Sequence, residues 1–147
     1  MKLSTRHFGE IDIEENKIIE FSEGIPGFQN LNQFVLLGEQ DDDETDSDAG
    51  VFYWLQSVDD PSTAFVMVNM VKYMPEYNPL VEVDQITGLG EYDADKFVFY
   101  NIAVFPENIK EATVNLKAPI VINDELKKGK QVICTNEEYA VSHFMFK

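Results

Sequence analysis

Short stretches of alternating side chains dominate this chain, and they predict β-strands rather than helices. The clearest stretch, residues 96–105, is apolar on both faces of an extended strand. One face would carry Val98, Tyr100, Ile102 and Val104, and the other Phe97, Phe99 and Phe105. Further strands are predicted at residues 11–13, 17–21, 35–37, 52–57, 64–70, 113–116, 119–123 and 131–134. Strands with two apolar faces indicate an all-β barrel or sandwich whose outer wall is itself covered.

A short helix is the expected cover. The best candidate runs from Asp84 to Leu89, where Asp84 could cap the first turn and Gly88 or Gly90 could end the helix. A second helical turn is predicted at residues 107–111. With so few helical positions, the chain is predicted to be mainly β.

Turn residues divide the strands. Residues 14–16 would join the first two strands as a hairpin, and residues 58–63 would join 52–57 to 64–70. In GIPGF, Pro26 and Gly27 suit the two central positions of a type II turn. Asn30 could cap one helical turn through Phe34, and Gly129 could supply a positive φ in the connection 124–130.

Composition limits the class of protein. The 147 residues are 44% hydrophobic, which suits one folded domain spanning residues 1–147. Cys134 is the one cysteine and is predicted to be a buried, inert thiol within strand 131–134. The chain lacks a signal-like apolar stretch at its start, and its apolar runs are too short to cross a bilayer, so a cytoplasmic protein without membrane contact is expected.

The formal net charge is -16, from 27 acidic and 11 basic side chains. Direct binding of nucleic acid is disfavoured, because such binding depends on cationic side chains that neutralise phosphates. A basic protein partner is favoured instead. Seven of the ten residues 39–48 are carboxylates, which predicts a solvated loop. A calcium loop starting at Asp42 fails, because Ser47 and Tyr53 occupy the positions that need glycine and a carboxylate.

The residues that catalysis would need are scarce. His7 and His143 are the histidines, and they lie near opposite ends of the chain outside any hydrolase motif. GKQ at Gly129 and GLG at Gly88 lack the glycines of phosphate-binding loops, and Asp59 with Asp60 suits a turn. The chain is predicted to be neither an enzyme nor a cofactor-binding protein. A metal-dependent enzyme that uses both histidines and carboxylates is the alternative from another class.

Several strings, taken in order, resemble the FliW family of flagellar assembly factors. They are EFSEGIPGF at 20–28, FYWLQSVDDP at 52–61, TVNLKAPIVIN at 113–123 and KGKQ at 128–131, and the similarity continues to Glu138 and Tyr139, over some 120 residues in all. The resemblance implies a small pseudo-barrel of antiparallel strands with a short helix. Two departures stand out: Met70 replaces an expected proline, and the tail SHFMFK is unusually apolar. Phe144, Met145 and Phe146 in that tail are expected to pack on the barrel, the alternative being an exposed docking segment.

The resemblance also implies two partners, the translational regulator CsrA and flagellin. Binding CsrA would relieve repression of flagellin mRNA, and flagellin held in the cytoplasm would occupy the protein until export frees it. The alternative within the same class is a flagellin chaperone that leaves the repressor alone. Among acidic positions near the predicted helix, Glu76, Glu82 and Asp84 are predicted to bind the partner.

Overall fold

The computed structural model describes residues 2–6, 9–38, 52–90 and 97–145. Its strands are β1 (Lys2–Thr5), β2 (Gly9–Asp12), β3 (Ile18–Glu20), β4 (Gln33–Gly38), β5 (Phe52–Ser57), β6 (Ala64–Val68), β7 (Phe97–Val104), β8 (Thr113–Val114), β9 (Ile120–Asn123), β10 (Lys128–Gln131) and β11 (His143–Phe144). Its helices are short: α1 (Met70–Tyr73), α2 (Val83–Ile86), and the 3-10 turns η1 (Glu15–Lys17), η2 (Thr87–Leu89) and η3 (Ile109–Glu111). The predicted mainly-β class is confirmed.

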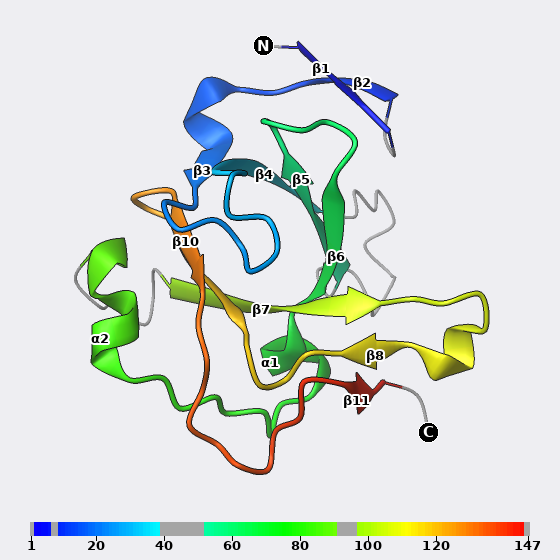
Figure 1. The fold of residues 1–147 in the computed structure, drawn as a ribbon, viewed down its shortest axis with the longest axis vertical. Helices are drawn as coiled ribbons and strands as arrows, with labels where there is room; N and C mark the ends of the chain where they lie inside the picture. Colours follow the sequence, from blue (N-terminus) through cyan, green and yellow to red (C-terminus); the bar gives the residue numbers. More distant parts are fainter. Residues whose placement is uncertain (1, 7–8, 39–51, 91–96, 146–147) are drawn as a thin grey trace.

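Seven of these strands form a closed ring in the order β3, β4, β5, β6, β7, β9, β10 (Figure 1). Neighbours in the ring are antiparallel except β10 and β3, which run parallel and meet at Lys128 and Glu20. β8 and β11 extend the sheet beyond β7, and β1 pairs with β2 as a separate two-stranded sheet. The pseudo-barrel is therefore confirmed, with one parallel junction that the sequence did not indicate.

Alternation along the strands fills the barrel. The predicted face of β7 is confirmed at three of its four positions, because Tyr100 is buried in the main core and Val98 and Ile102 pack against it. It is wrong at Val104, which ends the strand and is 61% exposed. The buried members of this core are Ile19, Phe21, Ile25, Leu31, Phe34, Leu55, Met67, Tyr100, Ile120 and Ile122. Each ring strand from β3 to β9 contributes at least one of them, so burial of this face selects the register of the ring.

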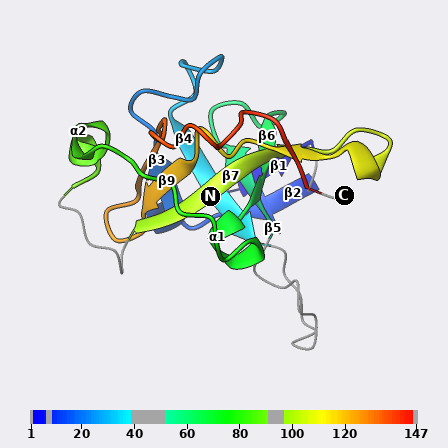
Figure 2. The same cartoon turned by 90° about the horizontal axis from the view of Figure 1, so that it is seen from below.

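The expected helical cover lies on the outside of β7. Phe97 and Phe99 pack there with Ile86 of α2 and Leu89 of η2. Figure 2 shows α2 on one side of the ring, opposite the connection that holds η3. Gly90 ends the helical segment with a φ of 101°, as predicted, but the predicted cap is wrong. Glu82 is the N-cap residue and makes no side-chain capping bond, so α2 depends on packing rather than on a cap.

The other helix and the ends of the chain cover the rest of the barrel. Met70 opens α1 instead of continuing the strand, and it is buried in a second core cluster with Tyr77, Val114 and Leu116. Met145 packs against this cluster, whereas Phe144 is exposed on β11 and Phe146 lies outside the described residues. The predicted packing of the tail thus holds for Met145 and fails for Phe144.

Two local predictions around β3 and β4 are wrong. β2 pairs with β1 rather than with β3, and the 3-10 turn η1, closed by Lys17 N donating to Glu14 O at 2.9 Å, redirects the chain between them. Phe34 belongs to β4 rather than to a helical turn capped by Asn30, because its side chain is needed in the core. The type II turn is confirmed: Gly27 has a φ of 88°, and Phe28 N donates to Ile25 O at 2.6 Å.

The last hairpin differs from its prediction in register and in the role of its glycine. β10 begins at Lys128 and ends at Gln131, so buried Cys134 follows the strand. The positive φ in the connection belongs to Lys127, at 54°, and not to Gly129. Gly129 faces the ring of Phe21, and a Cβ built on it would lie 2.5 Å from Phe21 Cζ. Glycine is required at this position because an aromatic core ring occupies the space.

Candidate partner-binding surface

Two of the three predicted partner residues, Glu76 and Glu82, lie along the segment that joins α1 to α2, residues 74–82, and Asp84 follows in α2. We call residues 74–82 the connecting segment (Figure 1). Its first anchor is Tyr77, whose hydroxyl donates to Leu116 O at 2.7 Å and accepts from Asn101 Nδ2 at 2.9 Å. Asn101 is fully buried and also donates to Asn115 O at 2.7 Å. Burial raises the pKa of Tyr77 well above its usual range, so the hydroxyl stays protonated and can donate.

A second set of bonds ties the connecting segment to the irregular chain after β10. Leu80 N donates to Asn136 Oδ1 at 2.7 Å, and Asn136 Nδ2 donates to Asn78 O at 3.1 Å. Thr135 N donates to Leu80 O at 2.7 Å, and Asn78 N donates to Tyr139 Oη at 2.9 Å. Since both backbone groups of Leu80 are bonded, its position is fixed although its side chain faces solvent.

α2 is held to the same chain by one side chain. Gln85 Nε2 donates to Ile133 O at 2.7 Å, and Ile133 N donates to Gln85 Oε1 at 2.8 Å. This amide pair resembles a bond between neighbouring strands, and it sets the first turn of α2 beside Ile133. The start of α2, the connecting segment and residues 133–136 therefore form one continuous surface.

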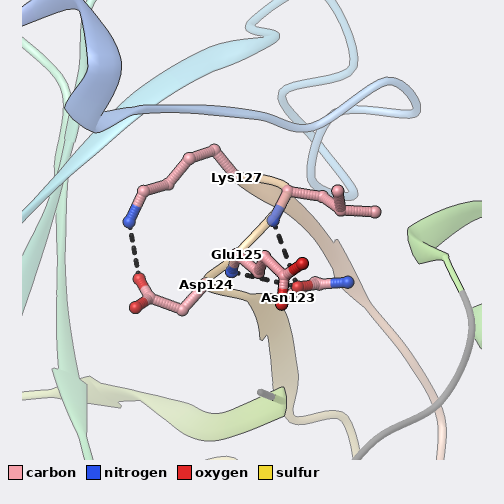
Figure 3. Close-up of polar contacts among 5 residues, drawn as sticks. Asn123, Asp124, Glu125 and Lys127 are labelled. Carbon is pink, nitrogen blue, oxygen red and sulfur yellow. Dashed lines mark hydrogen bonds and ion pairs between the residues drawn. The ribbon is translucent and has the colours of Figure 1, made fainter.

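The far end of the helical segment is fixed by Asn123 at the end of β9, and Figure 3 shows the contacts that Asn123 and its neighbours make in the connection to β10. Asn123 is buried; its Nδ2 donates to Leu89 O at 2.7 Å, and its Oδ1 accepts from Glu125 N and Leu126 N at 3.1 and 3.2 Å. Beside it, Lys127 Nζ lies 2.7 Å from Asp124 Oδ1. One buried amide thus positions both this connection and the end of η2.

The structure places the predicted partner residues as follows. Glu82 is the N-cap residue of α2, and Asp84 lies in its first turn, so the two belong to the same short element. Glu76 lies earlier in the connecting segment, next to the anchor Tyr77. All three carboxylates are exposed, and their role as partner residues stays a prediction.

Sequence reasoning missed the apolar part of this surface. Leu80, Val83 and Ile133 are exposed, and a hollow of about 310 Å³ lies beside Leu80. Its lining consists of Asn78, Pro79, Leu80, Val81, Ile86 and Phe99. The signal that could have revealed it is the string LVEVD at residues 80–84, where apolar and acidic residues alternate without forming a strand.

The carboxylate pair Asp59 and Asp60, a candidate for acid and base chemistry, has a structural explanation. Asp59 Oδ2 accepts from Asn32 N and Gln33 N at 2.7 and 3.0 Å, which ties the hairpin turn to the start of β4. Asp60 accepts from the hydroxyls of Ser62 and Thr63 at 2.7 and 2.8 Å, and these bonds lower its pKa. The pair therefore supports a turn, as predicted.

The candidate metal ligands are the acidic residues 39–48 and the two histidines. Residues 39–48 and His7 lie outside the described ranges, and His143 is half-buried on β11. Within the described ranges, no three histidine, cysteine or carboxylate residues are grouped to hold a metal ion. Nor does any described helix combine the length and apolar character that crossing a membrane requires.

The described residues thus form a small β-barrel of seven strands with an exposed acidic and apolar surface around the connecting segment. Comparison with known proteins gives the family. The FliW protein family model matches residues 2–145, so the chain belongs to the FliW family, as its sequence strings predicted.

Relatives from several bacteria agree with this assignment. A flagellar assembly factor FliW of Alkaliphilus metalliredigens is 41% identical over 145 residues, covering 99% of this chain and 86% of the relative. One of Caldanaerobacter subterraneus is 38% identical over 143 residues, covering 97% and 91%. A crystal structure of the flagellar assembly factor FliW superimposes with a TM-score of 0.87 at 35% identity, covering 100% of this chain and 98% of the other.

Proposed function

We propose that this protein binds the translational regulator CsrA, relieves repression of flagellin mRNA, and also binds flagellin in the cytoplasm. The observation that carries the proposal is the family match over residues 2–145, with relatives that are flagellar assembly factors. The two partners come from the family resemblance. In this scheme flagellin and CsrA compete for the protein, so flagellin synthesis follows export.

The charge of the chain supports a basic partner. With a net charge of -16, the protein would attract an RNA-binding repressor, whose own surface must neutralise phosphates. The exposed carboxylates Glu76, Glu82 and Asp84 would form part of the contact. Because Tyr77 and Asn136 anchor the connecting segment and Gln85 holds the start of α2, these residues would lose little conformational freedom on binding.

A three-way competition tests the proposal. Purified CsrA is bound to a labelled flagellin leader RNA, this protein is titrated in at low salt, and purified flagellin is then added. The protein should displace the RNA, and flagellin should restore the RNA complex. If the protein binds flagellin and the RNA stays bound throughout, the protein is a flagellin chaperone without repressor antagonism. Binding to neither partner would refute the proposal.

The contact residues are tested by charge reversal. Glu76→Lys, Glu82→Lys and Asp84→Lys together should weaken CsrA binding. The matched control reverses three exposed carboxylates elsewhere, Glu14, Glu15 and Glu107, and changes the net charge by the same amount. Equal weakening by both triple variants would mean that net charge, rather than this surface, drives the complex.

A further inference from the structure

The hollow beside the connecting segment has an apolar floor, a rim that combines Asn78 and Pro79 with the exposed Leu80, and exposed Val83 nearby on α2. Ile86 is buried beneath it, and Val81 and Phe99 pack against the same core cluster. At the rim, Leu80 is 53% exposed. Val83 on α2 is 70% exposed. Apolar side chains gathered around a concave site are typical of a surface that receives a partner's side chain.

The same surface is predominantly acidic. Glu82 and Asp84 flank Val83 on both sides along the chain. Residues 73–90, which supply most of the lining, and residues 131–145, which are hydrogen-bonded to them, contain no lysine or arginine. Lys117 approaches them from the barrel, and its Nζ donates to Asn136 O at 2.8 Å. The free charge of the surface is therefore negative, and an approaching segment gains from lysine or arginine.

We propose that this hollow receives a large apolar side chain from a cationic segment of the partner protein, with lysine or arginine beside it pairing with Glu82 and Asp84. The inference rests on the proposed function, since it describes how a basic partner is held. A second copy of this chain is the wrong occupant, because two chains of net charge -16 would bring their carboxylates together.

The arrangement gives the apolar contact most of the binding energy. Interfaces concentrate their energy in a few anchors that fill pockets, while exposed ion pairs at the rim contribute little and are screened by salt. The hollow is preformed, because both backbone groups of Leu80 are hydrogen-bonded and Gln85 holds α2 to Ile133. The carboxylates would then speed the encounter, and the hollow would determine how long the complex lasts.

The test uses purified CsrA as the basic partner and measures its affinity by calorimetry at low and high salt. The double variant Leu80→Ser/Val83→Ser should weaken binding on the order of tenfold at both salt concentrations. The charge variant Glu82→Gln/Asp84→Asn should weaken binding mainly at low salt. Val104→Ser/Leu126→Ser is the matched control, since these side chains are 61% and 50% exposed outside both segments, and its affinity should match the wild type.

The outcomes separate the two proposals. If the wild type binds and Leu80→Ser/Val83→Ser binds equally well, this inference is overturned and the proposed function stands. If the wild type fails to bind, the proposed function fails and this inference falls with it. Sedimentation of the wild type shows whether the hollow serves self-association: a dimer abolished by the same double variant would also overturn the inference. Should that variant unfold more easily than the wild type, Leu80→Ser alone replaces it, since Leu80 lines the hollow and its side chain is exposed.

Discussion

Replacing Gly129 with alanine is expected to destabilise the barrel although it adds one methyl group. The added carbon would lie 2.5 Å from Phe21 Cζ and 2.6 Å from Cε1. Phe21 is fully buried, and its ring packs edge-on against Phe34 with centroids 5.1 Å apart. The ring therefore cannot move aside without disturbing the main core.

The size of the effect follows from two opposing contributions. Overpacking a core costs about 1 to 3 kcal/mol. Loss of backbone freedom in the unfolded chain returns about 0.4 to 1 kcal/mol when glycine becomes alanine. A net loss of about 1 to 2 kcal/mol is expected. For a chain of 147 residues this lowers the melting temperature by roughly 3 to 6 °C.

The assay is urea unfolding followed by circular dichroism, with the midpoint and slope fitted for each variant. Gly88→Ala is the matched control, because a Cβ at Gly88 meets nothing within 4 Å, and its stability should equal or slightly exceed that of the wild type. Phe21→Leu should cost less in the Gly129→Ala background than in the wild type, because the smaller side chain leaves room for the methyl group. The reasoning is refuted if Gly129→Ala is as stable as the wild type, or if the two substitutions are additive.

Three further predictions concern polar groups. Asn123→Ala should lower the free energy of unfolding by about 1 to 3 kcal/mol, because Leu89 O and two backbone N–H groups lose their partner. Asp124→Ala, at an exposed side chain, is the control and should change the free energy of unfolding by less than about 1 kcal/mol in the same urea assay. Burial raises the folded-state pKa of Tyr77 and Tyr100, so the free energy of unfolding is unchanged below pH 10 and should fall above it by about 1.4 kcal/mol per pH unit for each tyrosine. Tyr100→Phe should therefore halve the slope of the unfolding free energy against pH above pH 10. An unchanged slope would contradict this. The pKa of Asp60 should lie below 3.8 by NMR titration and rise in Ser62→Ala, whereas an unchanged midpoint would show that the hydroxyl bond has no effect.

The features set by alternation along a strand could be predicted from the sequence. The two faces of β7 show this: Tyr100 and its neighbours fill the barrel, and Phe97 and Phe99 pack under α2. Local turn chemistry was equally readable at Pro26 and Gly27, where each residue type has one dominant conformation.

The pairing of strands was less accessible because it depends on contacts far apart in the chain. η1 separates β2 from β3, and nothing local distinguishes that 3-10 turn from a hairpin loop. At Gly129 the sequence indicated that glycine matters, but it did not show why. The constraint is the ring of Phe21, which lies more than 100 residues earlier in the chain.

The sequence predicted the negative charge of the candidate site but not its concave shape. Glu82 and Asp84 could be read as exposed acids near a helix. The hollow beside them is made by Leu80, Ile86 and Phe99, which come from an irregular segment, a helix and a strand. No periodicity links such residues, so the concavity appears only once the fold has brought them together.

The parallel junction between β3 and β10 determines when the barrel can exist during synthesis. β3 ends at Glu20, and its partner Lys128 is made only after most of the chain has been translated. The hairpins from β4 to β6 can form early, whereas ring closure must wait for this non-local contact. Until then the inner faces of β3 and β9 lack part of their enclosure, and any message truncated before β10 yields a chain that cannot close its core.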